Sequence, residues 1–199
     1  MITVTECQTL SKGKVQVSFD NGMQMILYAS EVRRFQLREG ASVTEEDLQK
    51  ILEEVIGKRA RKRAMHLLER MDRTEEQLRK KLEMGGYPQI CIDSAIAYVK
   101  FYHYLDDYRY ACVFIRGSQE KMSRRQIEMK LMQRGVGKDL IERALQEEYE
   151  GDETEQISIL LEKRHFAPGQ SDEKEFRRTY QYLMRRGFQS GDILKAMNP

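Results

Sequence analysis

Apolar and polar positions follow two different periods along this chain. Near the N-terminus apolar side chains occupy alternate positions, for example Val15, Val17 and Phe19, and this period of two is typical of half-buried β-strands. Residues 20–22 read Asp-Asn-Gly between two such segments. Because Asn and Gly tolerate positive φ, we expect a hairpin turn there. From about residue 44 the apolar spacing becomes three to four residues, which predicts helices.

Short helices are predicted to complete the N-terminal region. Ser30 is expected to cap a helix that runs to Leu37, and Thr44 with Asp47 three residues later resembles a capping box that opens the next helix. Residues 1–56 are therefore predicted to form a small β-containing domain with short helices.

A sequence repeat begins after Gly57. The segments LRKKLEMGGY (78–87), IEMKLMQRGV (127–136) and TYQYLMRRGF (179–188) align with offsets of 49 and 52 residues. The alignment places one Leu, one Gly and one apolar residue after the Gly in register, and it also matches an Ile and an Ala further on: Leu82, Leu131 and Leu183; Gly86, Gly135 and Gly187; Tyr87, Val136 and Phe188; Ile92, Ile141 and Ile193; Ala95, Ala144 and Ala196. So many matches at constant offsets indicate an internal repeat.

The repeated positions are those of a helix that ends in a Schellman motif. Gly takes the left-handed conformation after the last turn, and the apolar residue that follows packs back on the Leu. A second helix then begins, with Ile on its buried face. A third helix precedes each matched segment, at residues 60–71, 107–117 and 154–165. The fold class is therefore predicted as mostly α, a tandem array of three three-helix units (57–105, 106–150 and 151–199) after the N-terminal domain (1–56).

Charge is unevenly distributed along the chain. The net charge of +2 combines −3 for residues 1–56, +6 for 57–149 and −1 for 150–199. A basic central part is consistent with an anionic partner or with solvated helix faces. The N-terminal residues lack a signal-peptide pattern, and no segment has 18 consecutive apolar residues, so we expect a soluble, cytoplasmic protein with no membrane contact.

Two adjacent carboxylates, Asp106 and Asp107, are the clearest candidates for catalysis or metal binding. The three cysteines and three histidines are scattered without a CxxC motif, so no metal-ligand cluster or nucleophile–base set is visible. The pair stands at the start of a predicted helix, where Asp caps free backbone N–H groups. We therefore interpret the pair as structural, and we expect no enzyme activity and no cofactor.

The chain resembles a known family in its central and C-terminal parts. LDDYRYACVFIR (105–116) and RRQIEMKLMQRGV (124–136) look like the signature region of RecX, the bacterial regulator of the recombinase RecA. AMHLLERMDRTEEQLRKKL (64–82) and YQYLMRRGF (180–188) also match the family pattern. The resemblance covers residues 57–199, while the N-terminal β segment resembles an extension of some members. Gln126 departs from the basic residue expected at that position.

The resemblance implies a regulatory activity in DNA repair and recombination, including the SOS response. Family members bind the filament of RecA on single-stranded DNA and suppress strand exchange and ATP hydrolysis, and some bind DNA directly. The expected partners are therefore RecA and its filament, with a monomeric regulator. The alternative is a DNA-binding protein of helix-turn-helix-like units that acts without RecA.

Basic residues on faces that the repeat does not need for its core are the candidate RecA and DNA contacts. Lys and Arg supply affinity for phosphates that is independent of sequence and sensitive to salt. Arg124 and Arg125 directly follow the expected cap Ser123, where the positive end of the helix dipole disfavours cations, so a partner is one explanation and chance placement on a solvated face is the other. The candidates are Arg116, Lys121, Arg124, Arg125, Lys80, Arg185, Arg186, Lys58, Arg59, Arg61, Lys62 and Arg63.

Aromatic residues gather in sequence around the predicted boundary between the first two units, at Tyr98, Phe101, Tyr102, Tyr104, Tyr108 and Tyr110. Nucleic-acid bases could stack on them if they are exposed. Packing between adjoining helices, with hydroxyl groups that reach water, is the interpretation that we favour.

Overall fold

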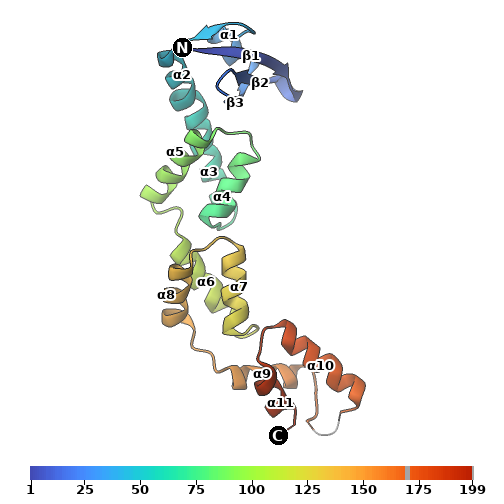
Figure 1. Cartoon of the computed structure of the whole chain (residues 1–199). Helices are drawn as coiled ribbons and strands as arrows, with labels where there is room; N and C mark the ends of the chain where they lie inside the picture. The colour runs from blue at the N-terminus through green and yellow to red at the C-terminus, as the bar shows by residue number, and fades with distance from the viewer. Residues whose placement is uncertain (169–170, 199) are drawn as a thin grey trace. The chain divides into compact units, whose positions relative to one another are not determined.

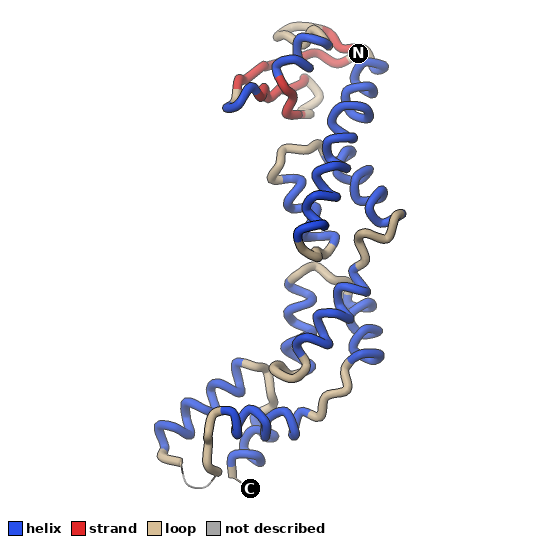
Figure 2. The backbone as a smooth tube through the Cα atoms, turned by 180° about the vertical axis from the view of Figure 1, so that it is seen from behind, coloured by secondary structure: helices blue, strands red, loops and turns tan. Residues whose placement is uncertain are grey.

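A computed structural model describes residues 1–168 and 171–198. The chain divides into two compact units, unit 1 from Met1 to Asp106 and unit 2 from Asp107 to Pro199 (Figure 1). Within the described residues, strands occur only in unit 1 (Figure 2). The sequence predicted strands only before residue 57 and helices after it.

An antiparallel sheet forms the N-terminal part of unit 1. Its strand order is β3-β2-β1-β4, and Val17, Met25 and Leu27 are buried on one face, as the alternation predicted. Gly22 adopts a φ of 80° in the turn between β2 and β3, where the hairpin was expected. The strands are β1 (Ile2–Thr9), β2 (Lys14–Phe19), β3 (Gln24–Tyr28) and β4 (Ser42–Val43).

Two short helices, α1 (Ala29–Arg34) and α2 (Glu45–Lys50), test the predicted caps. Ser30 as the cap of the first helix is wrong, because that helix begins at Ala29 and Tyr28 is its N-cap, two residues before Ser30. The Glu31 carboxylate accepts from the Tyr28 N–H at 2.8 Å. Glu31 can satisfy this N–H, so Ser30 is not needed as a cap. The Thr44 cap is confirmed: its hydroxyl accepts from the Asp47 N–H at 3.1 Å.

The helices of the first repeat continue directly from α2. A π-helical segment, η2 (Ile51–Gly57), leads into α3 (Lys58–Arg70), and α4 (Glu75–Glu83) and α5 (Gln89–Phe101) follow. One hydrophobic core extends from strand residues such as Val17 to helix residues such as Ile92. The sheet and the first three-helix repeat therefore share one core, and the predicted boundary at residues 56/57 falls inside a continuous helical segment.

Unit 2 contains two further sets of helices with separate cores. The first set is α6 (Asp107–Ser118), α7 (Arg124–Gln133) and α8 (Lys138–Glu148), and the second is α9 (Glu153–Lys163), α10 (Glu173–Arg185) and α11 (Ser190–Met197). Ile115, Ile127 and Ile141 lie in the first core, and Ile157, Leu183 and Ile193 lie in the second. The fold class predicted from the sequence, a helical array of three three-helix units after a small β-containing region, is confirmed.

The repeated Leu and Gly form the predicted helix ends. Gly86, Gly135 and Gly187 have φ values of 75°, 83° and 83°. In the first two repeats the N–H after the Gly donates to the repeated Leu: Tyr87 to the Leu82 carbonyl at 3.4 Å and Val136 to the Leu131 carbonyl at 3.1 Å. These bonds are those of a Schellman motif, and they explain why the Leu and the apolar residue after Gly repeat together.

Asp106 and Asp107 stand where a helix begins. Asp107 is the first residue of α6, and Asp106 directly precedes it. Among residues 1–168 and 171–198, no group of three or more His, Cys, Asp and Glu side chains is arranged to hold a metal ion. The same part of the chain contains no helix that is long and apolar enough to span a membrane.

Candidate anion-binding surface

In unit 2 the C-terminal end of α10 contacts the N-terminal end of α7, and both ends carry candidate arginines. The Ser123 N–H, just before α7, donates to the carbonyl of Arg186, the C-cap of α10, at 3.1 Å. The Gln126 side chain donates from Nε2 to the Arg185 carbonyl at 2.5 Å. The C-terminus of α10 thus packs against the N-terminus of α7, and the sequence-distant pairs Arg124–Arg125 and Arg185–Arg186 come together.

Acceptors surround the first turn of α7. The Ser123 hydroxyl accepts from the Gln126 N–H at 3.2 Å, which confirms Ser123 as the N-cap. The Glu153 carboxylate accepts from the Arg124 N–H at 3.0 Å. These acceptors and the negative end of the α10 dipole offset the unfavourable position of two arginines at a helix start. The unfavourable placement of Arg124 and Arg125 at the positive end of the helix dipole is therefore compensated within the chain and does not require a partner. An anion at this helix start would bind the two arginine side chains, because acceptors within the chain already bind the Arg124 and Gln126 N–H groups.

The arginine side chains of this junction differ in freedom. Those of Arg124, Arg125 and Arg185 are exposed. Arg186 is half-buried, with its guanidinium 3.7 Å from the centroid of the Tyr182 ring, a cation–π contact that fixes its position. We call Arg124, Arg125, Arg185 and Arg186 the α7–α10 surface.

Close backbone packing holds the α7–α10 surface together. A Cβ on Gly187 would lie 2.6 Å from the Ser123 Oγ and 2.9 Å from the Gln126 Cβ, so only Gly allows α10 to end so near α7. Gln126 Oε1 and Arg186 Nε are buried here without a hydrogen-bond partner. Gln126, the departure from the family pattern, thus joins two repeats through its side chain.

Arg116 and Lys121 lie just before α7 in the chain. Arg116 forms an ion pair with Glu148 at 3.3 Å, in which the Arg116 side chain is 58% exposed and the Glu148 side chain only 23%. Lys121 is exposed in the connection between α6 and α7. Arg116 is therefore held in part by a largely buried carboxylate, whereas the Lys121 side chain is exposed.

The dense basic run on α3 is partly committed to internal contacts. The Arg59 guanidinium pairs with the Glu31 carboxylate, donates to the Ile26 carbonyl at 3.2 Å and lies 4.6 Å from the centroid of the Tyr28 ring. These contacts hold α3 to the β3–α1 region. Arg59 therefore has a structural role in unit 1, which its place in a run of basic residues did not indicate.

The other basic residues of unit 1 have varied surroundings. Arg61 donates to the Ser94 hydroxyl at 3.2 Å, whereas Lys58, Lys62 and Arg63 are exposed. Lys80 forms an exposed i,i+4 ion pair with Glu76 at 3.0 Å. Lys58, Lys62 and Arg63 thus remain the most accessible cations of the predicted set on α3.

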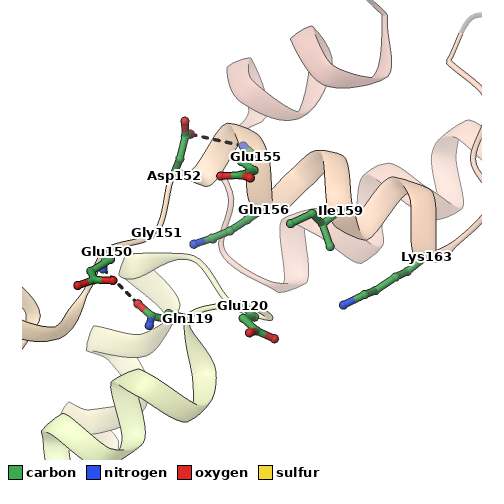
Figure 3. Close-up of a pocket in the computed structure, with 9 residues that line it drawn as sticks. All are labelled: Gln119, Glu120, Glu150, Gly151, Asp152, Glu155, Gln156, Ile159 and Lys163. Atoms are coloured by element: carbon green, nitrogen blue, oxygen red, sulfur yellow. Dashed lines mark hydrogen bonds between the residues drawn. The ribbon is translucent and has the colours of Figure 1, made fainter.

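A cavity of about 430 Å³ in unit 2 has the opposite charge (Figure 3). It lies where α6 ends and α9 begins, and four carboxylates and one amine line it: Glu120, Glu150, Asp152, Glu155 and Lys163. Its size is that of a ligand site, but its net negative charge disfavours phosphates. The cavity is therefore not a candidate for an anionic partner.

The buried cysteines do not have the properties of nucleophiles. Burial raises the pKa of the Cys91 thiol to about 11, and the thiol donates to the Leu52 carbonyl at 3.3 Å. Burial also raises the pKa of Cys112. A thiol that stays protonated at neutral pH is a weak nucleophile.

Comparison with known proteins places the helical part of the chain in a family. Models of the first, second and third three-helix domains of RecX match residues 60–98, 106–145 and 151–197. The chain belongs to the RecX family. The regulatory protein RecX of Caldanaerobacter subterraneus subsp. tengcongensis is 32% identical over 164 residues, 81% of each chain. That of Clostridium botulinum (strain Eklund 17B / Type B) is 29% identical over 197 residues, 98% of this chain and 92% of the relative.

Solved RecX structures have the same fold. A crystal structure of regulatory protein RecX superposes with a TM-score of 0.59 at 20% identity, over 99% of this chain and 98% of the other. RecX from Lactobacillus salivarius superposes with a TM-score of 0.58 at 19% identity, over 71% of this chain and 94% of the other. The similarity thus extends through the N-terminal sheet in the first comparison.

Sequence reasoning found the arginines of this RecX chain but missed what positions them. The α7–α10 surface also depends on Glu153, which bonds to Arg124 across 29 residues, and on Gly187, which lies against Ser123 across 64 residues. The Tyr182 ring stacks with the Arg186 guanidinium. The repeat did identify Gly187, as a helix-ending residue. A close approach to Ser123 has no signal in one sequence.

Proposed function

We propose that this member of the RecX family binds the filament of RecA on single-stranded DNA and regulates it, mainly by inhibiting strand exchange and ATP hydrolysis. The regulator acts as a monomer in the cytoplasm, in DNA repair and recombination under the SOS response. Membership of a family whose members are named regulatory proteins supports the regulatory role. The partner follows from the resemblance of the 105–136 region to the RecX signature.

The observation that carries the proposal is the convergence of arginines from two repeats at the α7–α10 surface. Arg124, Arg125 and Arg185 are exposed there, on helix ends that backbone bonds hold in place. The fixed helix ends gather these cations before a ligand arrives, and each guanidinium can bind a carboxylate or a phosphate through two parallel hydrogen bonds. A filament of protein and DNA offers both groups.

The test is charge reversal at the helix start, Arg124→Glu with Arg125→Glu. We expect filament affinity to fall at least tenfold at low salt, because two attractions become repulsions. The loss should shrink at high salt, where screening already weakens the wild-type attraction. Binding is measured by fluorescence anisotropy on RecA-coated labelled oligonucleotide at two salt concentrations, with strand exchange as the functional readout.

A matched control is available on α10. Arg177→Glu with Arg178→Glu makes the same charge change in the same unit, at exposed positions before the last turns of the helix. We expect the control to retain most of its affinity, and thermal unfolding checks that both variants fold. Equal losses in the two variants would show that only net charge matters and would remove the α7–α10 surface as the site.

The alternative, a DNA-binding protein that acts without RecA, is tested with the same molecules. We expect wild-type affinity for the RecA-coated oligonucleotide to exceed its affinity for the naked oligonucleotide. Equal affinities for the two, together with no effect on strand exchange, would favour the alternative.

A further inference from the structure

Four aromatic side chains lie exposed at the C-terminal end of α5. Phe101, Tyr102, Tyr104 and Tyr98 are 76%, 52%, 49% and 39% exposed. The packing role that the sequence favoured is wrong for Phe101, whose ring serves no core. By contrast, Tyr108 and Tyr110 pack partly buried against the core of the second repeat. We call Tyr98, Phe101, Tyr102 and Tyr104 the aromatic patch.

The aromatic patch is preformed by ring contacts and by the helix end. Tyr102 lies at the centre, with ring centroids 4.8 Å from Tyr98, 5.1 Å from Phe101 and 6.3 Å from Tyr104. His103 adopts a φ of 57°, and the Tyr104 N–H donates to the Val99 carbonyl at 2.9 Å. This Schellman-type turn folds Tyr104 back toward the helix. The rings therefore need little ordering before they bind a ligand.

One basic side chain of α3, that of Arg61, lies beside the patch. The Arg61 guanidinium lies 5.9 Å from the centroid of the Tyr98 ring, so α3 and the patch are adjacent there. Lys58 is three residues before Arg61, and Lys62 directly follows it; both are exposed. Residues three apart on a helix are surface neighbours, so Lys58 and Arg61 extend the positive charge away from the rings.

We propose that the aromatic patch binds single-stranded nucleic acid, with unpaired bases stacked on Phe101 and Tyr102 and the phosphates held by Arg61, Lys58 and Lys62. Aromatic side chains with a positive groove beside them are the elements that single-strand binders use. Arg61 beside Tyr98, with the exposed Lys58 and Lys62 on the same helix, favours this ligand over an apolar protein segment, which would gain nothing from positive charge. The site lies in unit 1 and shares no residue with the α7–α10 surface, so it goes beyond the function proposed above.

A single tryptophan can report on stacking, because the chain contains no Trp. In the full-length Phe101→Trp variant we expect titration with a (dT)₂₀ oligonucleotide to quench the fluorescence, since a stacked base is in direct contact with the indole. Met84→Trp is the control, at an exposed position on the C-cap of α4, and its fluorescence should change little. Equal quenching in both variants, or none in Phe101→Trp, would overturn the proposal.

A second variant separates stacking from apolar contact. Phe101→Leu with Tyr102→Leu keeps apolar side chains but removes the ring faces, so we expect affinity for the naked oligonucleotide to fall about tenfold or more, as loss of base stacking requires. Phe101→Trp should stay within about threefold of wild type. Lys58→Ala with Lys62→Ala should instead lower the salt dependence of binding.

These measurements contain no RecA, so they are independent of the filament assay. If the double Leu variant binds naked oligonucleotide as wild type does but binds the filament less tightly, the patch contacts protein and the proposal is wrong. If the Arg124/Arg125 variant fails to lose filament affinity while the patch variants behave as expected, the nucleic-acid site stands and the function proposed above does not.

Discussion

The two main basic regions of this protein, the start of α3 and the α7–α10 surface, hold their cations in different ways. The α3 run is denser in sequence, yet Arg59 is bound to Glu31, Ile26 and Tyr28. The α7–α10 surface is assembled from two distant pairs of arginines, and its internal bonds use backbone atoms and Gln126. Internal partners therefore decide which cations are available to a ligand, and local charge density is a poor guide.

The largest expected effect is a loss of stability when the internal contacts of the α3 region are removed. Arg59→Met leaves the Glu31 carboxylate, which is only 21% exposed, without its cation and should destabilise the fold by about 2–3 kcal/mol. Urea unfolding followed by circular dichroism, with hydrogen exchange of the α3 amides, measures this loss. Filament affinity of the folded fraction should remain close to wild type.

Lys62→Met is the control for Arg59→Met, on the exposed face of the same helix. It should change stability by less than about 0.5 kcal/mol. A stable Arg59→Met protein with weakened filament binding would contradict the comparison and make Arg59 a contact residue.

The next effect tests whether backbone packing builds the α7–α10 surface. Gly187→Ala must accommodate both a φ of 83° and a Cβ 2.6 Å from the Ser123 Oγ, whereas Gly22→Ala meets a φ of 80° in open space. The backbone term should cost each variant about 1 kcal/mol. We expect Gly187→Ala to lose about 1 kcal/mol more by overpacking, and to lose filament affinity with no change in charge.

Denaturant unfolding of the two glycine variants gives the difference directly. Equal destabilisation by the two substitutions would show that the α7–α10 contact yields easily. The surface would then depend on the arginines alone.

The smallest effect concerns pH and the ion pairs of unit 1. Glu75 accepts from Lys100 and Arg79, each at 2.8 Å. Burial opposes ionisation of Glu75, but the bonds from Lys100 and Arg79 outweigh it and lower the pKa below the ordinary 4.5. A carboxylate with a lowered folded-state pKa stabilises the fold above its unfolded pKa, and this stabilisation is lost as the pH falls through the folded value.

Unit 1 should therefore lose up to about 1 kcal/mol between pH 5 and pH 3 through this partly exposed network. Hydrogen exchange of the α4 and α5 amides at the two pH values measures the loss. Arg79→Met should flatten the dependence. If Arg79→Met retains the full dependence, another group is responsible.

Local signals in the sequence predicted most of the fold. The alternation around Val17, the turn at Gly22 and the repeated Leu–Gly helix ends each follow from one or a few residues that determine their own backbone. Gln36, His103 and His165 take positive φ at similar turns, and these were not predicted because such residues seldom signal that conformation.

The candidate site was predictable as a set of residues but not as an arrangement. Arg124 and Arg125 were recognised by their position after Ser123. Their proximity to Arg185 depends on hydrogen bonds between residues about 60 positions apart. Such a contact between distant residues leaves no recognisable pattern in a single sequence. For the same reason the pairing of Arg59 with Glu31, 28 residues earlier in the chain, was not predicted.

The junction of α7 and α10 also limits how the array could have been shortened or lengthened by gene rearrangement. A chain that stopped after α8 would leave the Ser123 N–H and the Gln126 amide without the carbonyls of residues 185 and 186, and the Arg124 N–H without Glu153. Each of these donors would then have to turn to water. The last repeat is thus a cap for its neighbour as well as a copy of it, and loss of one module would alter the ligand surface of the one that remained.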